Sequence, residues 1–177
     1  MISQEMNKMI NQQINAEIWS SYLYLSMSLQ AELIGYRGVA NWFLVQSREE
    51  LDHSRMLQKY LMAQESAVKL LPIHQVQTEW ATPLEMFVQA LEHERSVTKM
   101  IHTIMRQAQS EHDYATCSRM TWFIDEQVEE EETCTELVQR LEQAAQSPCY
   151  FMQIDYELQN RQYKQPLQKR DRQWFGA

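Results

Sequence analysis

The sequence has very few of the residues that interrupt helices. Only three glycines and four prolines occur among its 177 residues, whereas Leu, Met, Gln, Glu and Ala, which are good helix formers, are abundant. Strands joined by tight turns need more glycine and proline than this. The composition therefore predicts an all-α fold, and the length predicts one domain that is large enough to bury a core.

Cysteine is scarce as well. Cys117, Cys134 and Cys149 are odd in number, far apart and outside any Cys-x-x-Cys spacing. These features do not suggest a disulfide framework or a cysteine metal site. We expect three reduced thiols that are buried or without a function.

Long apolar runs and an excess of positive charge are also missing. A membrane span needs about 20 consecutive apolar residues, and no run approaches that length. The first residues, Met-Ile-Ser-Gln-Glu-Met-Asn-Lys-Met, lack the apolar core of a signal peptide. The net charge of −8 argues against a nucleic-acid partner and suits a protein that collects cations. We therefore expect a soluble, cytoplasmic protein that binds neither membrane nor nucleic acid.

Apolar residues at three- and four-residue spacing predict two long helices at the start of the chain. The first runs from Ser3, a typical N-cap, to about Leu33, and the second from about Val39 to Gln64. Because the turn between them is very short, they should form an antiparallel hairpin. The residues on the inward stripes of this hairpin are Met6, Ile10, Gln13, Glu17, Ser20, Tyr24, Met27 and Ala31, then Phe43, Gln46, Glu50, His53, Leu57 and Tyr60.

The helical pattern lapses between Glu65 and Thr82. An extended connection of this length can span a helix of about 25 residues, so the chain can return to the end where the bundle began. Pro83 after a capping threonine starts a third helix that ends at about Ser110, and a fourth follows from Tyr114 to Ala145. Their inward stripes are Phe87, Leu91, Glu94, Thr98, Ile101, Met105 and Ala108, then Met120, Phe123, Gln127, Glu130, Cys134, Leu137 and Leu141.

The end of the chain carries a shorter amphipathic segment, from Tyr150 to about Tyr163. It is too short to be a member of the bundle. The residues beyond it are basic, and we expect them to form a flexible tail without an assigned function. The sequence is thus divided into a helical domain, residues 1–163, and a tail, residues 164–177.

Polar residues on the inward stripes meet near the middle of both hairpins. Glu50 and His53 lie one turn apart on one helix face, so both can reach a single metal ion. Counted from the turn, Glu17 is level with His53 in the first hairpin. Glu94 is level with Glu130 in the second hairpin by the same count. Alone, the Glu-x-x-His pair could equally lie on a solvated face, but two level pairs are hard to explain by chance.

Assembled, these residues form a candidate metal centre. Its members are Glu17, Glu50, His53, Glu94, Gln127 and Glu130, with Tyr24 beside them. Four buried carboxylates are very costly unless cations compensate them or they are protonated. Two divalent metal ions would compensate them, and oxygen ligands with one imidazole suit iron or manganese, although zinc could also bind. The helical di-iron pattern has two Glu-x-x-His motifs; here one is intact and Gln127-x-x-Glu130 replaces the other.

The sequence resembles the bacterial non-haem ferritins over about residues 1 to 163. The residues that carry the resemblance are Glu17, Tyr24, Glu50-x-x-His53, Glu94, Trp122 and Glu126-Gln127-x-x-Glu130. It implies a ferritin-like four-helix bundle with a long crossover between helices two and three and a short C-terminal fifth helix. It also implies a hollow shell of 24 identical subunits, in which fifth helices cluster around four-fold axes.

The resemblance further implies roles for the site residues. Glu17, Glu50 and His53 would hold a first iron, with Glu50 bridging, and Glu94 with Glu130 a second, with Gln127 near the oxygen pocket. A third iron site would use Glu49, Glu126 and Glu129 and share Glu130. On spacing alone, those three glutamates could instead be a solvated acidic face.

The function implied is iron storage and detoxification by a ferroxidase. Fe(II) would be oxidised by dioxygen or hydrogen peroxide and deposited as ferric mineral.

Bacterioferritins carry a haem-binding methionine where this chain has Leu51, so we expect no haem. Tyr24 and Trp122 have the spacing of core aromatics and, beside a metal pair, are also candidate electron donors. The alternatives are a di-iron oxygenase or peroxidase that stores no iron, and a structural bundle without metal, which the buried carboxylates disfavour.

The other histidines lie off the inward stripes, so we expect them to be surface or packing residues. They are His74, His93, His102 and His112.

Overall fold

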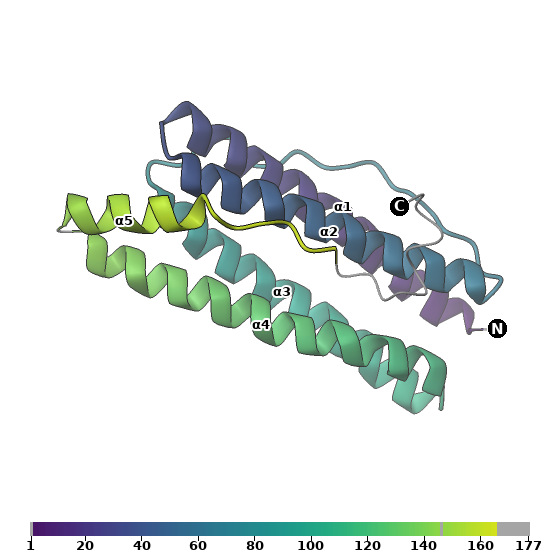
Figure 1. Ribbon diagram of the computed structural model, residues 1–177. Coiled ribbons are helices and arrows are strands. Elements are labelled where there is room, and N and C mark those ends of the chain that lie inside the picture. Colours follow the sequence, from purple (N-terminus) through teal and green to yellow (C-terminus); the bar gives the residue numbers. More distant parts are fainter. Residues whose placement is uncertain (1, 146, 166–177) are drawn as a thin grey trace.

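The computed structural model describes residues 2–145 and 147–165, and these residues form five helices and no strand. The helices are α1 (Gln4–Leu33), α2 (Arg37–Ala63), α3 (Pro83–Ser110), α4 (Tyr114–Ala144) and α5 (Pro148–Leu158). Figure 1 shows two antiparallel hairpins, α1 with α2 and α3 with α4, packed side by side, with α5 at one end of the bundle. The all-α fold with a long crossover and a short last helix is confirmed. The predicted tail beyond residue 165 lies outside the described residues.

Side-chain caps begin the helices where the sequence predicted starts. Ser3 accepts a hydrogen bond from the Met6 backbone N–H, and Thr82 accepts one from that of Glu85. Asp113 caps α4 in the same way. These bonds satisfy N–H groups that have no partner within the helix.

Three predicted helix boundaries were wrong by more than one residue. Helix α2 begins at Arg37 and not at Val39, and α5 runs from Pro148 to Leu158 and not from Tyr150 to Tyr163. The side-chain amide of Asn41 donates to the carbonyl oxygens of Leu158 and Arg161, at 3.1 and 3.0 Å. The chain can therefore leave the helix because its last carbonyls find partners on α2.

The crossover is held to α1 by asparagines spaced four residues apart. Asn11 accepts from the Lys69 backbone N–H at 2.6 Å, and Asn15 accepts from that of Leu71 at 2.7 Å. Both side chains also donate to carbonyl oxygens of the crossover. One face of α1 thus satisfies the backbone groups of a segment that has no helix or sheet of its own.

The buried apolar residues form two clusters along the bundle. One surrounds Phe43 and Phe87 and reaches α5, and the other surrounds Ile10 and Leu57 at the opposite end. All predicted inward residues of α1, α2 and α4 are buried, while Thr98 and Met105 of α3 are only partly buried. The buried Glu17, Glu50 and Glu94 each lie on their helix between residues of one cluster and residues of the other, so the bundle holds its candidate site near its middle. Among the described helices, none is both long and apolar enough to cross a membrane.

Candidate metal centre

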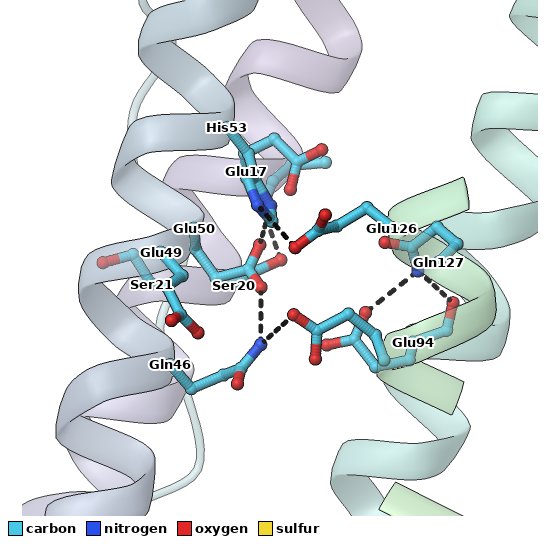
Figure 2. Close-up of polar contacts among 12 residues, drawn as sticks. Glu17, Ser20, Ser21, Gln46, Glu49, Glu50, His53, Glu94, Glu126 and Gln127 are labelled. Carbon is cyan, nitrogen blue, oxygen red and sulfur yellow. Dashed lines mark hydrogen bonds and ion pairs between the residues drawn. The ribbon is translucent and has the colours of Figure 1, made fainter. Parts of the chain in front are cut away.

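The first hairpin brings two carboxylates and one imidazole together. Ligand atoms of Glu17, Glu50 and His53 all lie within 4.8 Å of one another, and all three side chains are buried. Figure 2 shows them converging from α1 and α2, with His53 Nδ1 3.6 Å from Glu50 Oε2. The i, i+3 spacing on α2 and the level pairing across the hairpin are therefore both present in the structure.

The second hairpin contributes a matching set from α3 and α4. The Gln127 side-chain amide donates to Glu94 Oε2 at 3.1 Å and to Thr98 Oγ1 at 3.3 Å. The Tyr24 hydroxyl donates to Glu94 Oε1 and so connects this set to α1. Glu130 lies one turn beyond Gln127 and is also buried.

Gln46 joins the two hairpins at the site. Its amide nitrogen donates to Glu130 Oε1 at 2.8 Å and to Glu50 Oε1 at 3.3 Å (Figure 2). The helical periodicity predicts an inward position for Gln46, but Gln46 was not among the predicted site residues. An inward amide one turn before Glu50 was the signal that could have identified it.

Burial and like charge raise the pKa values of the central carboxyl groups. For both Glu17 and Glu50, burial shifts the pKa well above the ordinary value, and the charge of a second carboxylate raises it further, that of Glu50 for Glu17 and that of Glu94 for Glu50. Burial followed by the charge of Glu130 raises the pKa of Glu94 to about 8. These groups must therefore hold protons or share a cation near neutral pH.

Buried atoms without partners mark where a cation fits. Among the described residues, Glu17 Oε2, His53 Nε2 and Gln13 Oε1 are buried side-chain atoms without a hydrogen-bond partner. Such atoms are rare in proteins because each costs free energy. Two of the three belong to the Glu17, Glu50 and His53 cluster, and a carboxylate oxygen and an imidazole nitrogen are ligands for iron, manganese or zinc. The donor set therefore fits a divalent metal ion.

A surface pocket of about 640 Å³ opens beside the centre, between α2, α4 and the segment after α5. Its lining includes the four residues predicted for a third iron site, which are Glu49, Glu126, Glu129 and Glu130. Glu126 Oε1 lies 3.9 Å from His53 Nε2, so the pocket adjoins the cluster. Burial raises the pKa of Glu49 to about 6 and also raises the pKa of Glu126, whereas Glu129 is exposed. The acidic residues are thus neither a fully solvated face nor a closed cage.

Two charged residues were not predicted to have a role, Arg161 in the lining of this pocket and Asp52 on α2. Arg161 donates to Glu49 Oε2 at 2.5 Å. Asp52 is a buried carboxylate that accepts hydrogen bonds from Tyr163 and Arg55. Nothing in the local pattern marks Arg161, because only the folded chain brings it back to α2.

The aromatic neighbours pack edge-on against the site. The Trp122 ring lies 5.4 Å from the His53 ring, centroid to centroid, at an interplanar angle of 73°.

His93 packs against Trp19 and contacts the Ser20 hydroxyl at 2.7 Å. Burial lowers the pKa of His93 to about 4. His93 is thus a packing residue as predicted, and the other off-stripe histidines, His74, His102 and His112, are exposed. The three cysteines are free thiols, again as predicted.

Comparison with known proteins agrees with this geometry. A family profile described as a ferritin-like domain matches residues 7–144. The chain belongs to the ferritin family. A bacterial non-heme ferritin from Bacteroides fragilis is 40% identical over 161 residues, which cover 91% of this chain and 100% of that protein. Another bacterial non-heme ferritin, from Campylobacter jejuni, is 34% identical over 131 residues, covering 74% of this chain and 78% of that protein.

Solved ferritin structures superpose on most of this ferritin chain. An open-pore ferritin from the archaeon Archaeoglobus fulgidus matches with a TM-score of 0.90 and 39% identity, covering 92% of this chain and 100% of that one. A humanized archaeal ferritin matches with a TM-score of 0.91 and 38% identity, covering 93% and 99% of the two chains. The predicted resemblance to the ferritins is therefore confirmed.

Proposed function

We propose that this ferritin chain stores iron and that it oxidises Fe(II) to Fe(III) at a pair of sites inside each subunit. The observation that carries the proposal is the buried Glu17, Glu50 and His53 cluster with its two unpartnered ligand atoms. The names of its bacterial relatives support the same conclusion. In this proposal Fe(II) is the substrate, dioxygen or hydrogen peroxide is the oxidant, and the protein works in the cytoplasm. We propose no haem, since Leu51 stands where bacterioferritins carry their haem ligand.

The residues of the centre have distinct tasks in this proposal. Glu17 and His53 hold the first iron, Glu94 and Glu130 hold the second, and Glu50 lies between them. Glu17, Glu50 and Glu94 each give up a proton when iron binds, because burial raises their pKa values and favours the neutral form. Carboxylate oxygens prefer the harder Fe(III) ion, so the same ligands favour the oxidised product.

Hydrogen bonds keep these ligands in place. Gln46 holds Glu50 and Glu130 at the junction of the hairpins. Gln127 and Tyr24 do the same for Glu94. Fixed ligands reduce the reorganisation that iron binding and oxidation require. In this proposal, Tyr24 and Trp122, which lie beside residues of the centre, also donate electrons during oxygen reduction.

The assembled protein is expected to be a 24-subunit shell that retains iron. Sedimentation at micromolar concentration and physiological salt should give the mass of such a shell, and metal analysis after Fe(II) exposure in air should find hundreds of irons per particle. A dimer or a 12-subunit particle would contradict the shell. An assembled particle that oxidises Fe(II) but retains only a few ions per subunit would instead indicate a di-iron oxygenase or peroxidase.

A third iron site in the acidic pocket is the finer part of the proposal. Its residues line one pocket, and one of them, Glu126, lies next to His53. Changing Glu49, Glu126 and Glu129 together to alanine should leave Fe(II) binding at the pair largely intact. The variant should nevertheless change the iron-to-oxygen ratio and slow the recovery of activity between iron additions, because iron loses its path from the pair. Oxygen consumption during repeated additions measures both effects.

The matched control removes the same charge from elsewhere on the surface. Glu32, Glu79 and Glu92 are exposed and lie outside the pocket, so their triple alanine variant should behave as the unchanged protein. If both triple variants bind as many tight Fe(II) ions as the unchanged protein in anaerobic titration, and iron-soaked crystals show no density beside Glu130, there is no third site.

A further inference from the structure

The segment that follows α5 is attached to α2 by several side chains. Near its start, the Asn41 side chain donates to the carbonyl oxygens of Leu158 and Arg161. Further on, the Tyr163 hydroxyl donates to the buried carboxylate of Asp52. Figure 1 shows the segment running back from α5 along the side where the first hairpin faces α4. The segment therefore forms one wall of the acidic pocket.

Arg161, which belongs to this segment, places a positive charge in the lining of the pocket. Its guanidinium lies 4.5 Å from the centroid of the Trp42 ring and donates to the Trp42 carbonyl oxygen at 3.1 Å. The same group donates to Gln46 Oε1 at 2.8 Å and to Glu49 Oε2 at 2.5 Å. The side chain is 23% exposed. With a ring contact and three acceptors, it is held in one position and is not a freely solvated surface arginine.

The guanidinium of Arg161 occupies a carboxylate oxygen that a third iron would need as a ligand. Glu49 is one of the pocket carboxylates, and its Oε2 already binds the guanidinium. A metal ion at the same carboxylate would lose that oxygen and would be repelled by the arginine, which cannot be deprotonated in a protein. The two cations therefore compete for Glu49.

We propose that Arg161 is the chain's own cation at the third position, which an incoming iron must displace from Glu49. This inference rests on the proposed third site. Arg161 keeps Glu49 neutralised when no metal is bound, and it weakens the third position relative to the pair. A weak third position suits iron that moves between the pair and the pocket, because a tightly held ion would block that movement.

The same side chain also orients a residue of the centre. Gln46 accepts from Arg161 with its oxygen, so its nitrogen faces Glu50 and Glu130. A variant that tests the charge should therefore keep a donor at residue 161. Glutamine does so, since its amide carries N–H groups but no charge. Arg161→Gln thus separates the competition at Glu49 from the orientation of Gln46.

The experiment is calorimetric titration of the full-length, assembled, metal-free protein with Zn(II), which binds oxygen and nitrogen ligands without redox chemistry. Arg161→Gln is expected to tighten the third zinc per subunit by about threefold to tenfold, the range expected when a partly buried ion pair no longer competes. The first two zinc ions should bind with unchanged affinity. Arg161→Lys keeps the charge and should bind the third zinc at least as weakly as the unchanged protein does.

Two further variants control for indirect effects. Arg140→Ala removes another partly buried arginine, whose partner Glu157 lies on α5, and it should leave all three zinc affinities unchanged. In a Glu49→Ala background, Arg161→Gln should have a smaller effect, since only the repulsion between the arginine and the metal ion remains. An unchanged third affinity in Arg161→Gln would overturn the inference while the third site stands. A total of two zinc ions in both proteins would overturn it together with the third site, and fewer than two in the unchanged protein would count against the proposed pair itself.

Discussion

Replacing Glu50 and His53 together with alanine is expected to abolish rapid Fe(II) oxidation while the shell still assembles. The double substitution removes two of the three ligands in the tightest cluster of the bundle. Loss of even one supporting contact at a metal site costs about tenfold to 100-fold, so we expect the initial rate to fall by more than about 100-fold. Stopped-flow absorbance of the ferric product measures the rate, and sedimentation shows whether the particle is intact.

The protein should survive this change because the substitution has two opposing effects on stability. Alanine leaves a cavity, but it also removes a buried carboxyl group that is costly to ionise. The double variant Glu50→Gln with His53→Gln keeps more of the volume and should be equally inactive.

Asp52→Asn is the matched control, because Asp52 is a buried carboxylate on the same helix. Its hydrogen-bond partners are Arg55 and Tyr163, which are not members of the cluster. It should oxidise Fe(II) at the unchanged rate. Wild-type initial rates in the Glu50 and His53 double variants would show that the oxidation site lies elsewhere.

The metal-free protein is expected to lose stability as the pH rises from about 4.5 to about 8, and divalent metal should restore it. In the unfolded chain a glutamate ionises near pH 4.5, but in the folded protein burial holds the Glu94 proton up to about pH 8. Between these values the unfolded state has lost a proton that the folded state still binds, so rising pH favours unfolding. Each such group contributes about 1.4 kcal/mol per pH unit, and Glu17 and Glu50 shift in the same direction.

Urea unfolding followed by circular dichroism, with a chelator and then with Zn(II), measures this dependence. The chelated protein should unfold at progressively lower urea from pH 5 to pH 8, and zinc should move the midpoint up most at the high end. Glu94→Gln removes one ionising group and should flatten the slope. A metal-free stability that does not change with pH in this range would mean that the carboxyl groups are not buried as the structure shows.

Most of the fold follows from local patterns in the sequence. Three- and four-residue spacing of apolar side chains predicts helix faces, and caps such as Ser3 and Thr82 predict where helices begin. The hairpin geometry then predicts which residues are level, and the Glu17, Glu50 and His53 cluster is the result. These predictions succeed because each depends on residues close in sequence or related by one short turn.

The misplaced end of α5 and the missed residues have a different origin. The end of α5 is set by Asn41, which lies more than 100 residues earlier in the chain. Gln46 is visible as an inward polar residue, but only the packing of the two hairpins shows that it spans Glu50 and Glu130. A side-chain bridge between hairpins depends on their relative position, which periodicity within one helix does not specify.

The sequence by itself therefore determined the helices, their inward faces and the candidate residues of the centre, because helix period and short turns are local constraints. Only the tertiary structure decided which residues complete the lining of the acidic pocket. Arg161 reaches Glu49 because the chain leaves α5, turns back and binds along α2. That path depends on contacts between residues far apart in sequence, and such contacts leave no periodic signal in the chain.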